Sequence, residues 1–245
     1  MSRIGANSGV GFATAKVIAC ASEVFHVIMA SRSLEKAKSA MSEIEAAGTK
    51  GLLSTVQLDV TDERSIEQAV ALVNQKFGRL DVLVNNAAAG SIDPDVKTRF
   101  QLCMDTNVIG PAVVSAAFRP LLLKSQKPYS IYVSSGLGSM AKASDPTSIT
   151  YRSSTNGEAY RASKAALNMI ALQESIGFSS TALKVFVVCP GFVRSNLRGQ
   201  SEEARSGWGK AGDPQVSGET ILSVIQGERD ADAGQFVHRD GVYPW

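Results

Sequence analysis

The stretch that decides the fold is Gly5-Ala6-Asn7-Ser8-Gly9-Val10-Gly11, which stands after four residues and opens a helical pattern over 9–20. Glycines at i, i+4 and i+6 allow a tight turn, and the backbone N–H groups at the start of the helix can approach a pyrophosphate. The spacing differs from the commoner GxGxxG, and a flexible N-terminal segment could show it too. The turn therefore predicts a dinucleotide site only together with the pattern that follows it.

That pattern is an alternation of apolar, β-branched runs with longer helical segments. The runs cover 24–29, 52–58, 82–84, 130–133, 185–189 and 235–238, and the helical segments cover 9–20, 34–47, 63–77, 96–123, 159–177 and 216–227. Continuous apolar runs predict strands buried on both faces. The alternation predicts an α/β, doubly wound Rossmann fold, with a parallel sheet and helices on both faces. We expect one domain over 1–245, with a cofactor half over about 1–125 and a catalytic and substrate half over about 126–245.

Composition excludes several classes of protein. The 245 residues are 44% hydrophobic and 20% charged, which is globular, and 25 Lys and Arg against 23 Asp and Glu leave no basic stripe for nucleic acid. Three scattered cysteines indicate a reducing compartment, and no apolar run is long enough to span a bilayer. With two histidines, no CxxC and no HExxH, we expect no metal site. We therefore expect a cytoplasmic protein with no membrane partner.

Two further motifs carry chemistry. Tyr160 and Lys164 stand four apart at the start of a helical segment, so they share one helix face, and the cation is expected to lower the tyrosine pKa. Ser135 ends a predicted strand, where doubly wound sheets bind their ligands. Each motif alone has a plainer interpretation, as a surface helix pair or as a serine-rich turn.

In this order, the motifs resemble those of the short-chain dehydrogenase/reductase family, over nearly the whole chain. The family's TGxxxGxG has Ile4 in place of Thr, and its NNAG appears as Asn85-Asn86-Ala87-Ala88. The resemblance implies catalytic roles for Asn107, Ser135, Tyr160 and Lys164. It implies cofactor contacts by Gly5, Asn7, Ser8, Gly9, Val10, Gly11, Ser31, Arg32, Asp59, Val60, Asn86, Ala87, Tyr160, Lys164, Pro190, Gly191, Val193 and Ser195.

The resemblance implies hydride transfer between a nicotinamide cofactor and a ketone, an aldehyde or a secondary alcohol. Tyr160 would exchange the proton, Ser135 would bind the oxygen, Lys164 would hold the ribose, and Asn107 would anchor a relay water. We expect NADP (NADPH) rather than NAD, because Ser31 replaces the acidic residue of an NAD site and Arg32 can pair with a 2′-phosphate. The family also implies a homodimer or homotetramer, through the helices over 96–123 and 159–177.

Two departures from the family pattern bear on function. Ser135 and Tyr160 are separated by 25 residues, where the family commonly has about a dozen, an enlargement found in carbonyl-reductase-like members. Only four residues precede Gly5, so the first strand is truncated or missing, or residues 2–4 pair as a stub. The intact set of Asn107, Ser135, Tyr160 and Lys164 favours an active oxidoreductase. The second departure leaves open a non-catalytic or impaired dinucleotide-binding, regulatory protein, with a methyltransferase as a distant third possibility.

Overall fold

The computed structural model describes residues 2–4, 6–151 and 157–245, and its centre is an eight-stranded sheet in the order β3-β2-β1-β4-β5-β6-β7-β8. All neighbours pair in parallel except β8, which runs antiparallel to β7. The strands are β1 (Ser2–Ile4), β2 (His26–Ser31), β3 (Leu52–Gln57), β4 (Val82–Asn85), β5 (Tyr129–Val133), β6 (Lys184–Val188), β7 (Phe236–His238) and β8 (Gly241–Tyr243). The predicted Rossmann architecture is confirmed; the hairpin partner β8 was not predicted.

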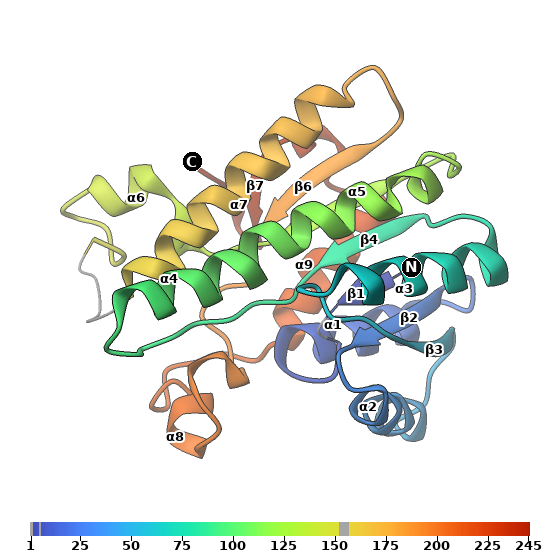
Figure 1. Cartoon of the computed structure of the whole chain (residues 1–245), viewed down its shortest axis with the longest axis horizontal. Coiled ribbons are helices and arrows are strands. Elements are labelled where there is room, and N and C mark those ends of the chain that lie inside the picture. Colours follow the sequence, from blue (N-terminus) through green and yellow to red (C-terminus); the bar gives the residue numbers. More distant parts are fainter. Residues whose placement is uncertain (1, 5, 152–156) are drawn as a thin grey trace.

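The described α-helices cover both faces of this sheet. They are α1 (Gly9–Ala21), α2 (Leu34–Ala46), α3 (Glu63–Phe77), α4 (Val96–Met104), α5 (Gly110–Leu122), α6 (Met140–Ser144), α7 (Glu158–Gly177), α8 (Glu202–Arg205) and α9 (Gln215–Gln226). Buried side chains of α1, α2 and α9 pack on one face, and those of α3, α5 and α7 pack on the other. Figure 1 shows α4, α5 and α7 lying across the front of the sheet. Within the described segments, no helix is both long and apolar enough to cross a membrane.

The first strand corrects one expectation and confirms another. A missing centre strand is wrong, because Ser2–Ile4 pair with Ile28–Ala30 of β2 and with Leu83–Asn85 of β4. The stub alternative is confirmed, and the strand has three residues where β2 has six. Three residues suffice to connect the two halves of the sheet at its carboxyl end, where the glycine turn follows.

The predicted helix over 96–123 is divided. Between α4 and α5 the chain forms a π-helical turn, Asp105–Ile109. Gly110 then packs closely against Val60, in the loop after β3, since a Cβ on Gly110 would lie 2.8 Å from Val60 Cγ2. A π turn shifts the register of a helix face, and such turns occur often at functional sites. Here the turn carries Asn107, whose side chain is fully buried.

Candidate active site

The glycine turn fits a dinucleotide at the carboxyl end of β1. Ala6 N–H donates to Ala30 O at 3.1 Å, and Ser31 Oγ donates to Asn7 Oδ1 at 3.2 Å, so the turn is tied to the end of β2. Gly9 has a φ of +53° and opens α1 behind Ser8, whose side chain makes no cap hydrogen bond. A glycine in this conformation and an uncapped helix start leave backbone N–H groups for a phosphate. Gly5 lies outside the described residues.

The predicted adenosine contacts stand at the ends of β2 and β3. Ser31 is buried, while Arg32 is exposed and fixed through its backbone, since Gln57 Nε2 donates to Arg32 O at 3.2 Å. Asp59 Oδ1 accepts from Thr61 N–H at 3.0 Å and from its hydroxyl at 2.8 Å. The residue directly after β2 is therefore an exposed arginine and not an acidic residue. A guanidinium at this place suits a ribose that carries a phosphate.

Asn107 connects three segments of the site. Its Oδ1 accepts from Ala89 N–H at 2.7 Å, and its Nδ2 donates to Ala89 O at 2.8 Å and to Ser163 Oγ at 2.9 Å. These bonds join the π turn to α7 and to the loop after β4, which also holds Asn86 and Ala87. Both Nδ2 hydrogens are already in hydrogen bonds, so a water bound at Asn107 would donate to its backbone or side-chain carbonyl oxygen.

Ser135, Tyr160 and Lys164 come together at the carboxyl end of β5. The Ser135 hydroxyl is close enough to the Tyr160 phenol to lower its pKa, and Lys164 Nζ lies 5.7 Å from the centre of the Tyr160 ring. Lys164 is 1% exposed and donates to Val133 O at 2.9 Å. Ser135 Oγ also accepts from Leu137 N–H at 3.2 Å, which fixes its position.

The electrostatics differ from the expectation that Lys164 lowers the Tyr160 pKa. Burial raises the pKa of Tyr160 above its usual range, and the Ser135 hydroxyl opposes this only in part. Burial also lowers the pKa of Lys164 to about 8. Desolvation disfavours the charged form of each group, and here it outweighs their partners. Tyr160 is therefore a protonated phenol at neutral pH, and Lys164 is mostly charged there.

The turn after β6 brings the last predicted group beside the glycine turn. Gly191 has a φ of +82°, Val193 is buried, and Ser195 Cβ lies 3.2 Å from the point where a Cβ on Gly9 would stand. Pro190 O accepts from Ser217 Oγ at 2.8 Å, which anchors the turn to α9. Sequence positions 9 and 195 are thus in contact, as a cofactor spanning both would require.

Two buried groups of the site were not predicted. Cys189 Sγ accepts from Gly136 N–H at 3.2 Å, and burial raises the pKa of its thiol. Arg99, which is 4% exposed, donates to Glu158 Oε1 at 2.5 Å and to Asp93 O. This pair fixes the first residue of α7, two positions before Tyr160. Arg99 and Glu158 are 59 residues apart in the sequence, so no local pattern predicts that they pair.

The comparisons agree with this geometry. The short chain dehydrogenase family profile matches residues 3–206. A short-chain dehydrogenase/reductase of Talaromyces stipitatus (tropE) is 34% identical over 97% of this chain and 94% of its own length, and a short-chain dehydrogenase of Penicillium roqueforti (anuI) is 36% identical over 80% and 79%. Among solved structures, the NADPH-bound carbonyl reductase from chicken fatty liver has a TM-score of 0.79 and 27% identity, covering 100% of this chain and 98% of that one.

The fold and the site define an oxidoreductase of the Rossmann type. The chain belongs to the short-chain dehydrogenase/reductase family.

Proposed function

We propose that this protein is an NADP-dependent oxidoreductase that interconverts a ketone or aldehyde and the corresponding alcohol. The observation that carries the proposal is the grouping of Ser135, Tyr160 and Lys164 beside the carboxyl ends of β5 and β6. This edge of a doubly wound sheet is where ligands bind. A binding protein would need the glycine turn, but it would not need a phenol and a hydroxyl grouped around a buried ammonium.

Each side chain has a role that its surroundings allow. The cofactor supplies the hydride when bound. Tyr160, protonated because burial raises its pKa, gives its hydroxyl proton to the oxygen of the carbonyl substrate. Ser135 donates its hydroxyl hydrogen to the same oxygen, while its Oγ accepts from Leu137 N–H. Lys164 holds a positive charge beneath the tyrosine ring, where it favours the phenolate that remains.

The preference for NADP over NAD rests on Ser31 and Arg32. Ser31 is buried and its hydroxyl donates to Asn7, and a serine has no carboxylate for the ribose hydroxyls. The neighbouring Arg32 is exposed. A guanidinium pairs with phosphate in a bidentate way. The chicken carbonyl reductase, which resembles this chain over its whole length, was solved with NADPH.

Apolar side chains stand on the segments next to Ser135 and Tyr160. Leu137 precedes α6 and is 37% exposed, Phe192 follows the Pro190-Gly191 turn and is 54% exposed, and Leu197 lies near Tyr160. An apolar rim around few polar groups is typical of small-molecule sites. We therefore expect a carbonyl compound with an apolar body. A cytoplasmic, dimeric or tetrameric form stays a prediction.

The test is Tyr160→Phe, which removes the transferable proton and keeps the ring. Turnover of a panel of ketones and aldehydes with NADPH should fall about 100-fold or more, while NADPH binding followed by fluorescence stays near the wild-type value. Equal turnover in the two proteins would contradict the role of Tyr160. Binding of NADPH by the wild type without turnover on any compound would favour the non-catalytic alternative.

A further inference from the structure

The segment from Val193 to Gly212 lies over both halves of the active site. Val193 and Gly212 form a bridge at its base, and Gly212 N–H donates to Phe192 O at 2.9 Å. Near its start, Ser195 lies against the glycine turn at Gly9. Two residues later, Leu197 O and Tyr160 Cδ2 stand 3.8 and 3.9 Å from one point, the place of a Cβ on Gly90. The shape of this segment therefore sets what surrounds Tyr160.

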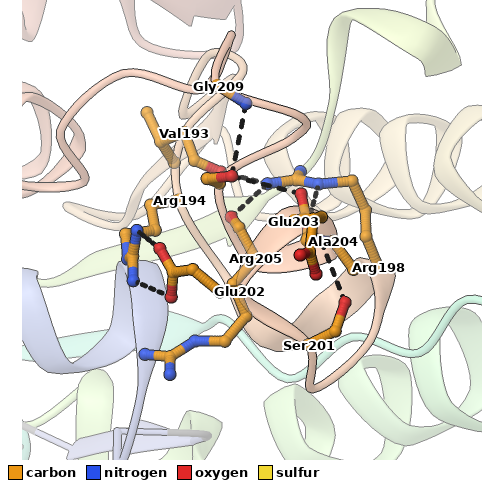
Figure 2. Close-up of polar contacts among 10 residues, drawn as sticks. Val193, Arg194, Arg198, Ser201, Glu202, Glu203, Ala204, Arg205 and Gly209 are labelled. Carbon is orange, nitrogen blue, oxygen red and sulfur yellow. Dashed lines mark hydrogen bonds and ion pairs between the residues drawn. The ribbon is translucent and has the colours of Figure 1, made fainter.

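Arg198 is the side chain around which the segment folds. Its Nε donates to Ala204 O at 3.0 Å, and its Nη2 donates to Val193 O at 2.9 Å and to Arg205 O at 3.0 Å (Figure 2). The guanidinium also stacks on the Phe192 ring at 4.5 Å. The same Arg205 O accepts from Ser195 N–H at 3.2 Å. One side chain thus joins the beginning of the segment to its middle through three backbone carbonyls.

The backbone of the segment needs such a fixed centre. Gly207, Trp208 and Gly209 have φ values of 57°, 55° and 80°, and for tryptophan this left-handed conformation is unfavourable. A Cβ on Gly207 would lie 2.6 Å from Phe192 Cζ, so the ring that Arg198 stacks on is also pressed against this turn. By contrast, the ion pair of Arg194 with Glu202 is exposed on both sides and closes only a local loop (Figure 2).

We infer that Arg198 is a positioning residue for the carbonyl substrate: its guanidinium holds 193–212 in one folded shape and so fixes Leu197 beside Tyr160. The inference rests on the proposed function for the reaction, but not for the shape of the segment. A guanidinium is needed because its planar donors reach carbonyls in fixed directions, which an ammonium cannot reproduce. Burial lowers the pKa of Arg198, and no carboxylate is hydrogen-bonded to it in the described part of the chain.

The experiment compares Arg198→Met and Arg198→Lys with Arg239→Met, an exposed arginine paired with its neighbour Asp240. Hydrogen exchange by mass spectrometry is followed over 193–212 in the full chain. In both Arg198 variants, exchange there should be at least about tenfold faster while the sheet keeps its wild-type rates, and Arg239→Met should match the wild type. Unchanged protection in Arg198→Met, or restoration by Lys, would overturn the inference, as would faster exchange over the whole chain.

Kinetics give the second readout. For the best-reduced compound of the carbonyl panel, Arg198→Met and Arg198→Lys should raise KM about tenfold and change kcat less than threefold, because Tyr160 itself is intact. A fall in kcat with unchanged KM would overturn the positioning role. If the wild type reduces nothing, the proposed function fails, and the exchange comparison still decides whether Arg198 holds the segment.

Discussion

Lengthening β1 by two apolar residues should stabilise this protein. A cavity of about 710 Å³ opens at the amino-terminal ends of β2, β4 and β5, and its lining includes His26, Ile28, Phe77 and Val82. Ser2 pairs with Ile28 and with Leu83, so a residue placed directly before Ser2 would stand opposite Val27 and Val82. Inserting Val-Val between Met1 and Ser2 would extend the ladder into that cavity.

The magnitude follows from burial and hydrogen bonding. Two buried valines contribute about 1.5–3 kcal/mol each, and about three added ladder bonds contribute about 0.5–1.5 kcal/mol each. Ordering two residues costs about 1–2 kcal/mol each. The net gain is about 4 kcal/mol, and at 2–4 °C per kcal/mol for a chain of this size, Tm should rise by about 10 °C.

The assay is thermal unfolding followed by circular dichroism, with the NADPH dissociation constant measured on the same proteins. An inserted Gly-Ser pair has the same length but no apolar side chain, and it serves as the matched control. Binding should tighten in the Val-Val form only, because the glycine turn then follows a firmer strand. Equal Tm values for the Val-Val and Gly-Ser forms would show that the cavity does not accept a longer β1, and the reasoning would fail.

Three other predictions concern charge and assembly. Arg32→Ala should reduce the preference for NADPH over NADH by about 10-fold or more, measured as the ratio of the two kcat/KM values; an unchanged ratio contradicts the assignment. Lys164 titrates near 8 when folded and near 10.5 when unfolded. The unfolded state therefore binds more protons between these values, and stability rises with pH there. Relative to Lys164→Met, urea unfolding should show the wild type gaining about 2 kcal/mol from pH 8 to 9.5. Ile109 and Met169 are 54% and 52% exposed on the α4–α5 and α7 side, so light scattering should give a dimer or tetramer, and Met169→Glu should shift it toward the monomer; a wild-type monomer refutes this.

The sequence predicted most of the fold because its elements are decided locally. The helix over 63–77 has the bounds that its regular apolar period and Gly78 predict, and Gly78 ends it at a φ of 69°. Its cap is Asp62, which accepts from Arg64 and Ser65 N–H, and not Thr61, the cap that the sequence suggests. Strands such as β4 and β6 are continuous apolar runs. The π turn at 105–109 has no such pattern, because it depends on packing against distant residues, as the approach of Gly110 to Val60 shows.

The members of the candidate site can be proposed from the sequence, but their electrostatics cannot. Tyr160 and Lys164 share a helix face by spacing alone, and Ser135 follows from the end of β5. The protonation states depend on how deeply the neighbouring segments bury these groups, and those segments come from α4, the turn after β6 and the 193–212 segment. Arg99 pairs with Glu158 far along the chain, and Arg198 binds carbonyls of an irregular loop, so no spacing rule points to either arginine.

Burial sets the protonation states of Tyr160 and Lys164, which the motif alone does not reveal. The raised pKa of Tyr160 keeps the phenol protonated over a wider pH range than a free tyrosine, and it also makes the phenol a weaker acid. Oxidation of an alcohol would instead need the phenolate, which desolvation disfavours. Lys164, with a pKa near 8, still supplies a positive charge at neutral pH but loses it in mildly alkaline solution. In the proposed mechanism, Lys164 offsets the cost of the phenolate only while it stays charged. Under the proposed function, the pH range of turnover therefore depends on how deeply Tyr160 and Lys164 are buried as well as on the motif itself.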